Sequence, residues 1–366
     1  MMSIASTDWR AFAIFQFFNG YIFGHMKTTC ITLLIETTDG KYRLVPFACI
    51  QWGLGFMINS IVLYLANDWR MFIVIVNLIS SPLIYFYLLF QESYRWLLAR
   101  GDLRGAADVM TELNSERWAK GDRENNVDGE ITSEQLIMLL PDNESKRNFH
   151  SCFYLFLEKS TCRTTIVLML MMVTYGMVGS WFHSGNDAIS VDINIHFLLH
   201  GALTFWISSV IVLLDLKVPK LGYKPQLLFG MSLLAVCFAV TLFFNVTSYQ
   251  APRHIIYIAT SIAAITDSSI VLMMICHTTA AVYPTVVRSK AFGLLFACEN
   301  LGSIIMTILL SDYFSNGPVV GHFTCEALVI GAVLLAILYF PETKFMITRE
   351  FLIDVFPTYN SNIGQS

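Results

Sequence analysis

The sequence predicts an all-α membrane protein, a polytopic helical bundle with about nine transmembrane helices. The first observation is compositional: 55% of the 366 residues are apolar and only 14% are charged, whereas an average soluble domain carries about 25% charged residues. The second is a mean hydropathy of +0.59, and the third is a series of long apolar runs. A soluble globular enzyme, a disordered chain and a repeat solenoid are therefore excluded.

Nine apolar runs are long enough to cross a bilayer, since a helix needs about 20 residues to span a hydrocarbon core of roughly 30 Å. The first run is too long for the core of a signal peptide and no small-residue cleavage site follows it, so we expect it to remain as a membrane anchor. The runs are approximately residues 11–35, 44–66, 70–91, 164–184, 193–214, 225–247, 255–283, 289–312 and 319–341.

The basic residues of the connectors predict the orientation of the chain. One side receives 19 Lys and Arg residues, and the other receives only Arg10, Arg70 and Arg253. Because cytoplasmic loops carry the excess of Lys and Arg, we expect the N-terminus outside and the C-terminus in the cytoplasm, with the plasma membrane as the location. The sequon at Asn245 then faces outward and is a candidate glycosylation site, whereas the one at Asn143 faces the cytoplasm.

The longest connector divides the chain into unequal parts. We expect a partial N-terminal half of three spans over residues 1–91, a cytoplasmic central loop over 92–163, a C-terminal half of six spans over 164–346 and a cytoplasmic tail over 347–366. The lipid bilayer is the first partner that this organisation implies.

Other classes of partner and chemistry find no support in the sequence. The formal net charge is −4, and no basic cluster with interleaved aromatic residues is present, so nucleic acid is not an expected partner. The eight cysteines include no CxxC pair, which argues against a zinc site or a redox dithiol. Without a nucleophile elbow, a phosphate loop or useful carboxylate pairs, neither an enzyme nor a cofactor is expected.

An acid and base pattern recurs at the predicted cytoplasmic ends of the spans. Six residues separate Glu36 from Arg43, and six separate Ala281 from Arg288. An acid also follows directly after the third span and after the last span, at Glu92 and Glu342. Such charges either pair across helix ends and act as a gate, or anchor the helix ends at the interface.

Four segments resemble the organic cation, anion and zwitterion transporters of the major facilitator superfamily. They are Glu92-Ser93-Tyr94-Arg95-Trp96-Leu97, Lys220-Leu221-Gly222-Tyr223-Lys224-Pro225, Tyr283-Pro284-Thr285-Val286-Val287-Arg288 and Pro341-Glu342-Thr343. The resemblance runs through the whole chain. It implies a fold of twelve spans, of which the nine runs here are equivalent to spans four to twelve.

The chain departs from the pattern of this family at several motif positions. Gln91 and Tyr94 replace two prolines, and Ala281 stands where the family has glutamate. Pro219 occupies the position of an aspartate, and Asp215, about one helical turn earlier, is a possible substitute. The candidate gating residues are Glu36, Arg43, Glu92, Arg95, Asp215, Arg288 and Glu342.

The resemblance implies a transporter of small organic ions that works by alternating access. The alternative is a transport-incompetent membrane protein, either a truncated product or a regulator that associates with a full-length relative. The absence of the first three spans, together with Ala281 and Pro219 at gate positions, motivates this alternative.

Ionisable residues inside the spans are candidates for substrate binding, because such groups are costly in lipid. Lys27 suits an anionic group of a substrate, whereas Glu299 favours a cationic substrate or ion coupling. Asn300 stands at a position that is charged in members of the family that this chain resembles. A zwitterionic substrate or a Lys27–Glu299 pair would reconcile the two opposite charges. Asp267 either binds a proton or cation or makes a structural hydrogen bond.

Aromatic and histidine side chains complete the set of candidates. Tyr175, Trp181 and Trp206 either line a site for quaternary ammonium groups or pack in the bundle and at its interface. His196 and His200 share a helix face, but a metal site needs a third ligand, so a polar contact inside the bundle is preferred.

Overall fold

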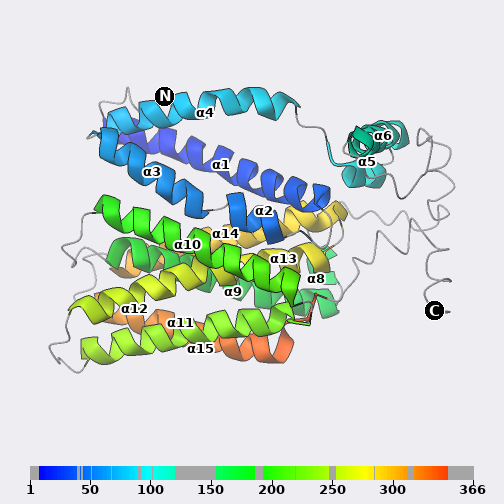
Figure 1. The fold of residues 1–366 in the computed structure, drawn as a ribbon. Coiled ribbons are helices and arrows are strands. Elements are labelled where there is room, and N and C mark those ends of the chain that lie inside the picture. Colours follow the sequence, from blue (N-terminus) through cyan, green and yellow to red (C-terminus); the bar gives the residue numbers. More distant parts are fainter. Residues whose placement is uncertain are drawn as a thin grey trace.

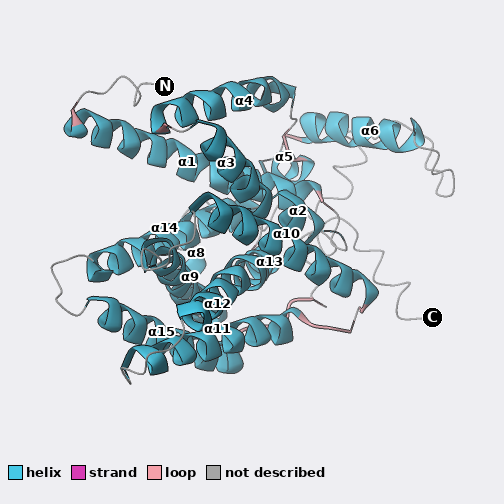
Figure 2. Cartoon of the chain, turned by 60° about the vertical axis from the view of Figure 1, so that its left-hand side comes forward, coloured by secondary structure: helices cyan, strands magenta, loops and turns pink. Residues whose placement is uncertain are grey.

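The computed structural model describes fourteen parts of the chain, and every regular element in them is a helix (Figures 1 and 2). Helices long and apolar enough to cross a membrane, together with the absence of strands in the described parts, confirm the predicted all-α membrane bundle. The described residues are 8–38, 42, 44–50, 52–66, 68–89, 92–100, 102–119, 154–157, 159–185, 193–218, 220–246, 253–283, 285–310 and 317–344.

Four helices form a first group at one side of the molecule (Figure 1). They are α1 (Trp9–Thr37), α2 (Leu44–Ile50), α3 (Trp52–Ala66) and α4 (Trp69–Leu89). The side chain of Asp8 accepts a hydrogen bond from the backbone N–H of Arg10 and caps the start of α1. The predicted run 44–66 forms two helices rather than one.

The remaining long helices form a second group and pack against one another. They are α9 (Lys159–Gly185), α10 (Ile193–Lys217), α11 (Tyr223–Val246), α12 (Arg253–Thr266), the π-helical segment η5 (Asp267–Val271), α13 (Leu272–Val282), α14 (Thr285–Leu310) and α15 (Gly317–Tyr339). The segments α12, η5 and α13 follow one another without a break along a single apolar segment, Ile255–Val282.

Six of the nine expected spans coincide with helices of the second group that are long and apolar enough to cross a membrane. In the first group, Gly53–Ala66 and Trp69–Pro82 are shorter apolar helices. Helix α1 has 29 residues, which exceeds the length that a bilayer requires. Polar residues such as Gln16 and Asn19 lower its hydropathy.

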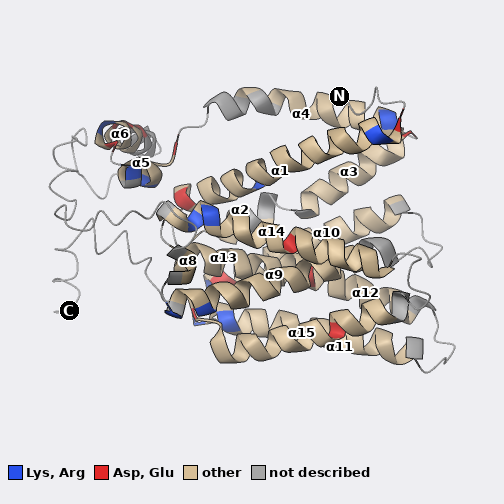
Figure 3. Cartoon of the chain, turned by 180° about the vertical axis from the view of Figure 1, so that it is seen from behind, with Lys and Arg blue, Asp and Glu red and all other residues tan. Residues whose placement is uncertain are grey.

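Three short or polar helices lie at one end of the bundle: α5 (Tyr94–Arg100), α6 (Leu103–Ala119) and α8 (Tyr154–Leu157). Figure 3 shows that most of the drawn Lys and Arg residues gather at this same end. Arg10 and Arg70 lie in the first turns of α1 and α4. The charge asymmetry expected from the connectors is thus present along the axis of the bundle.

Glycines bring helix backbones together at two places. A methyl group on Gly176 of α9 would overlap the backbone carbonyl of Glu299, and one on Gly302 of α14 would overlap the carbonyl of Val173. Between the two groups, a Cβ on Gly201 of α10 would lie 2.7 Å from the carbonyl oxygen of Gly53 in α3. Small residues permit such close helix crossings in membranes, so these glycines fix the positions of α14 and α3.

Candidate substrate and gating sites

A partly buried ion pair connects the two helix groups at Lys27 and Glu299. Lys27 Nζ lies 2.9 Å from Oε1 and 2.8 Å from Oε2 of Glu299, so the ammonium binds both carboxylate oxygens. The side chains are 13% and 15% exposed, which leaves a small part of each accessible. Lys27 Nζ also lies 4.2 Å from the centre of the Phe296 ring, at a distance typical of a cation–π contact. The structure thus contains the Lys27–Glu299 pair, which would reconcile the two opposite charges noted in the sequence.

Three other groups lie close enough to this pair to interact with it electrostatically. Tyr175 of α9 and Asp267 of η5 both interact with Glu299, and Cys276 of α13 interacts with both members of the pair. Asn300 is exposed and donates a hydrogen bond from Nδ2 to the backbone carbonyl of Phe296 in its own helix. Glu299, and not its neighbour Asn300, therefore carries the contact between the helix groups.

A second ion pair joins the same two helices near one end of the bundle. Arg288 Nη1 lies 3.3 Å from Glu36 Oε1, and both side chains are only 3% exposed. Arg95 interacts electrostatically with Glu36 as well. Glu36 is nine residues after Lys27 and Arg288 is eleven before Glu299, so the two pairs are about 14 to 16 Å apart along antiparallel helices at 1.5 Å per residue. Arg43 lies outside the described residues.

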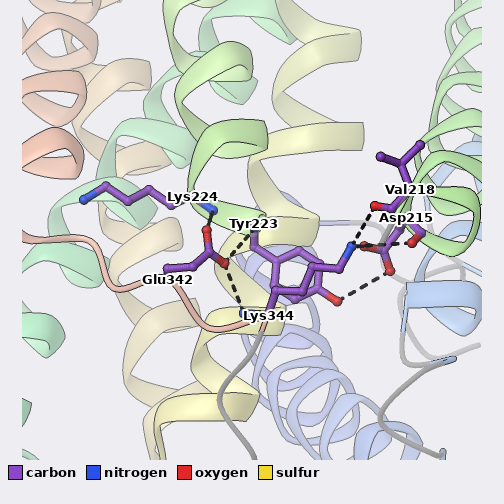
Figure 4. Close-up of polar contacts among 6 residues, drawn as sticks. All are labelled: Asp215, Val218, Tyr223, Lys224, Glu342 and Lys344. Atoms are coloured by element: carbon purple, nitrogen blue, oxygen red, sulfur yellow. Dashed lines mark hydrogen bonds and ion pairs between the residues drawn. The ribbon is translucent and has the colours of Figure 1, made fainter. Parts of the chain in front are cut away.

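A third polar network ties together the helix ends of the second group (Figure 4). Lys344 Nζ, after the end of α15, lies 2.5 Å from Asp215 Oδ1 in the last turn of α10. The hydroxyl of Tyr223, at the start of α11, donates to Asp215 Oδ2 at 3.5 Å. Asp215 thus binds a cation that follows the last span, and this network stays within one helix group.

Glu342 caps helix α11 from outside that helix. Its carboxylate accepts hydrogen bonds from the backbone N–H groups of Tyr223 at 2.9 Å and Lys224 at 3.2 Å, as Figure 4 shows. These are unpaired donors at the positive end of a helix dipole, which favours an acid. A Cβ on Gly222 would overlap the Glu342 carboxylate, so a larger residue here would displace that carboxylate from its present position. Glu92, by contrast, is exposed.

The two candidate tryptophans lie in different environments. Trp181 is buried and packs against Phe238 and His322, with ring centres 5.3 and 4.3 Å away. Trp206 is 67% exposed on α10, as expected for contact with lipid or its interface. In the described parts of the chain, no cluster of three or more His, Cys, Asp and Glu residues is positioned to hold a metal ion.

The two histidines of α10 make contacts inside the bundle. His196 Nδ1 hydrogen-bonds to the hydroxyl of Tyr257, and the His200 ring packs against Phe56 and Phe182. The backbone of Asn245 lies in the last turn of α11, but its side chain and Thr247 lie outside the described part of the chain.

Two contributors to these sites were missed by the sequence analysis. Lys344 lies directly after the motif Pro341-Glu342-Thr343, so its place beside a motif was a usable signal. Phe296 lies one turn before Asn300, on the face of α14 that meets Lys27. Nothing in a single sequence distinguishes this phenylalanine from the other 27.

Residues 1–352 match the family model described as "Sugar (and other) transporter". The chain belongs to this family. It is accordingly a multi-pass membrane protein of a transporter family and not an enzyme. The family model that matches residues 1–352 confirms the resemblance to transporters of the major facilitator superfamily.

Curated relatives match almost the whole chain. Solute carrier family 22 member 1 from Oryctolagus cuniculus is 23% identical over 97% of this chain and 61% of its own length. Solute carrier family 22 member 7 from Rattus norvegicus is 22% identical over 97% of this chain and 64% of its own length. The chain thus spans a little over three fifths of the length of these relatives.

A solved structure shows the same fold. The proton:xylose symporter XylE of the major facilitator superfamily, bound to 6-bromo-6-deoxy-D-glucose, superimposes with a TM-score of 0.64 over 88% of this chain and 70% of that chain. At 14% identity, this similarity concerns the fold alone.

Proposed function

We propose that this protein moves small organic ions across the plasma membrane by alternating access, and that charged substrates bind at Lys27 and Glu299. The observation that carries the proposal is the partly buried ion pair between helices of the two groups. Matches to several members of solute carrier family 22 support transport of organic ions. The N-terminus faces outside and the basic end of the bundle faces the cytoplasm, in line with the positive-inside rule.

An ion pair of this kind offers each charge of a substrate a matching group. A substrate carboxylate replaces Glu299 at Lys27, a substrate ammonium replaces Lys27 at Glu299, and a zwitterion engages both residues. A zwitterion keeps both charges compensated, whereas an anion or a cation compensates one residue and releases the other from its partner. The rings of Phe296 and Tyr175 lie beside the pair and suit the apolar or cationic part of an organic ion.

The Glu36–Arg288 pair acts as the cytoplasmic gate in this proposal. It joins α1 to α14 on the same two helices as the substrate pair, so opening toward the cytoplasm must separate these two side chains. The network of Asp215, Glu342 and Lys344 stays inside the second helix group and holds its helix ends together while the gate moves. Ala281, at the position where the resembling family has glutamate, lies in α13. Because alanine has no carboxylate, this position adds no acid to the gate.

Uptake by reconstituted protein tests the proposal. The probes are a labelled quaternary ammonium, a labelled aromatic carboxylate and labelled carnitine as a zwitterion. We expect uptake of at least one probe, and we expect Lys27→Met and Glu299→Gln each to reduce it at least tenfold, a loss of about 1.4 kcal/mol in the transport step. The double exchange Lys27→Glu with Glu299→Lys restores the ion pair and should recover part of the activity.

Two exposed residues provide matched controls for these charge losses. Lys220→Met and Asp108→Asn remove a charge of each sign from exposed positions outside both ion pairs, and uptake should stay at the wild-type level. Folded protein that takes up none of the three probes would instead support the alternative of a transport-incompetent, regulatory membrane protein.

A further inference from the structure

Asp267 stands at an irregular point in the middle of a membrane-spanning segment. It is the first residue of the π-helical segment η5, twelve residues after Ile255 and fifteen before Val282, the ends of that segment. Short π-helical segments inside α-helices are rare and occur frequently at functional sites. Asp267 is only 3% exposed. The backbone irregularity and the buried acid therefore coincide.

The surroundings of Asp267 offer no compensation for a negative charge. No residue in the described parts of the chain donates a hydrogen bond to its carboxylate. Its electrostatic partners are Tyr175 of α9, Glu299 of α14 and Cys325 of α15. The other helices packed against η5, which are α10, α11, α12 and α13, bring no charged partner to Asp267 among the described residues. The neighbouring full charge is thus another carboxylate.

The other fully buried acids of the described chain each form an ion pair with a basic side chain. Glu36 is paired with Arg288, and Asp215 is paired with Lys344. The partly buried Glu299 has the ammonium of Lys27 on both of its oxygens. An isolated carboxylate without donors costs several kcal/mol in a low-dielectric interior and is normally neutralised. Asp267 lacks a cation that could do this. Glu326 of α15 also has no ion-pair partner among the described residues, but it is less deeply buried than Asp267.

We propose that Asp267 is a proton-binding site of this carrier, and that it holds its proton while the Lys27–Glu299 pair is closed. The proton comes from bulk water on one side of the membrane and returns to bulk water when the site opens. Protonation converts a costly buried anion into a neutral carboxylic acid, so no cation or donor from the surrounding helices is needed.

The neighbouring ion pair links this proton to substrate, and this link rests on the proposed function. When an anionic substrate takes Lys27 away from Glu299, the charge of Glu299 is no longer offset beside Asp267. The proton on Asp267 is then held more tightly, since its loss would leave two adjacent carboxylates. Binding of an organic anion and retention of the proton therefore favour each other, and the effect is reciprocal.

Infrared spectroscopy of the purified protein in detergent tests the proton site without any transport. We expect the C=O stretching band of a protonated carboxyl group at neutral pH, shifted in deuterium oxide and absent from Asp267→Asn. The buried control Asp215→Asn removes a carboxyl group that is paired with Lys344 and leaves Asp267 in place, so it should keep the band. Asp267→Glu keeps a carboxyl group and should show the band at a shifted frequency. This variant can assign the band to residue 267 if Asp267→Asn does not fold.

Three results would overturn the proton site. They are a wild-type spectrum without the band, an unchanged band in folded Asp267→Asn, and a band that appears only when sodium is removed, which would assign the site to a metal cation. These spectra do not depend on transport. A positive spectrum in protein that takes up no probe would contradict the proposed function alone.

A transport measurement then tests the link. In proteoliposomes, an inward proton gradient should drive accumulation of the labelled aromatic carboxylate above equilibration in the wild type. Asp267→Asn should still equilibrate the probe but lose the accumulation. Gradient-driven accumulation that survives in this variant would contradict coupling through Asp267, whereas equal equilibration by both proteins leaves the proposed carrier function intact.

Discussion

The two ion pairs between α1 and α14 are built from the same helices but differ in their surroundings. The Glu36–Arg288 pair is 3% exposed on each side, whereas Lys27 and Glu299 keep 13% and 15% of their side chains accessible. A fully buried pair holds two elements together, and its partners are inaccessible to a solute. A pair that keeps some access can exchange one partner for a solute. Depth of burial therefore distinguishes the proposed gate from the proposed binding site on one helix pair.

The largest expected effect comes from breaking the deeper pair. Arg288→Met removes the ion-pair partner of the buried Glu36, leaves Arg95 as the cation that interacts with it, and should lower the free energy of unfolding by about 3 to 5 kcal/mol. Lys27→Met should cost less, about 1.5 to 3 kcal/mol, because water reaches the remaining Glu299 carboxylate. Thermal unfolding of both variants in the same detergent compares them. A larger loss at Lys27 than at Arg288 would reverse the assignment of gate and binding site.

An intermediate effect is expected from the helix crossing that carries Glu299. Gly176→Ala places a methyl group against the Glu299 carbonyl, so α9 and α14 must separate, at a cost of about 1 to 3 kcal/mol. Uptake should fall as well, because Glu299 moves relative to Lys27. Gly179→Ala is the matched control three residues on, where a Cβ meets open space, and it should leave stability unchanged or raise it slightly. Equal stability and equal uptake of the two variants would contradict the close crossing of α9 and α14 at Gly176.

The smallest effect is expected at the cap of α11. Glu342→Gln keeps the shape of the side chain but removes the charge that faces the positive end of the helix dipole, a loss of about 0.5 to 1 kcal/mol. A small downward shift in the unfolding temperature should result, and it should be larger at low salt. The Lys27–Glu299 pair lies elsewhere, so the affinity for a transported probe should not change. A change in affinity would mean that the cap and the binding site are coupled.

Patterns along the chain predicted the fold and several of the partners. Apolar runs of sufficient length gave the helices of the second group, and opposite charges in spans of different halves indicated the pairing of Lys27 with Glu299. The motif around Glu342 also marked a residue with defined contacts. These features depend on composition and spacing, which a sequence displays directly.

Other features depend on contacts that spacing does not reveal. Glu36 pairs with Arg288 in the other helix group, and no periodicity along either segment indicates that partner. The π-helical turn at Asp267 adds one residue to a turn, which an apolar pattern tolerates without a signal. The division of residues 44–66 into α2 and α3 was likewise invisible, because the hydrophobic run is continuous.

The contact between Gly53 of α3 and Gly201 of α10 restricts how the two helix groups can move against each other. Because no side chain separates these backbones, neither helix can slide along the other without a steric clash, but the helices can tilt around the crossing. The crossing is therefore a natural pivot. Displacements grow with distance from a pivot, so a small rotation there would produce the widest separation at the membrane surfaces, where the proposed substrates would enter and leave.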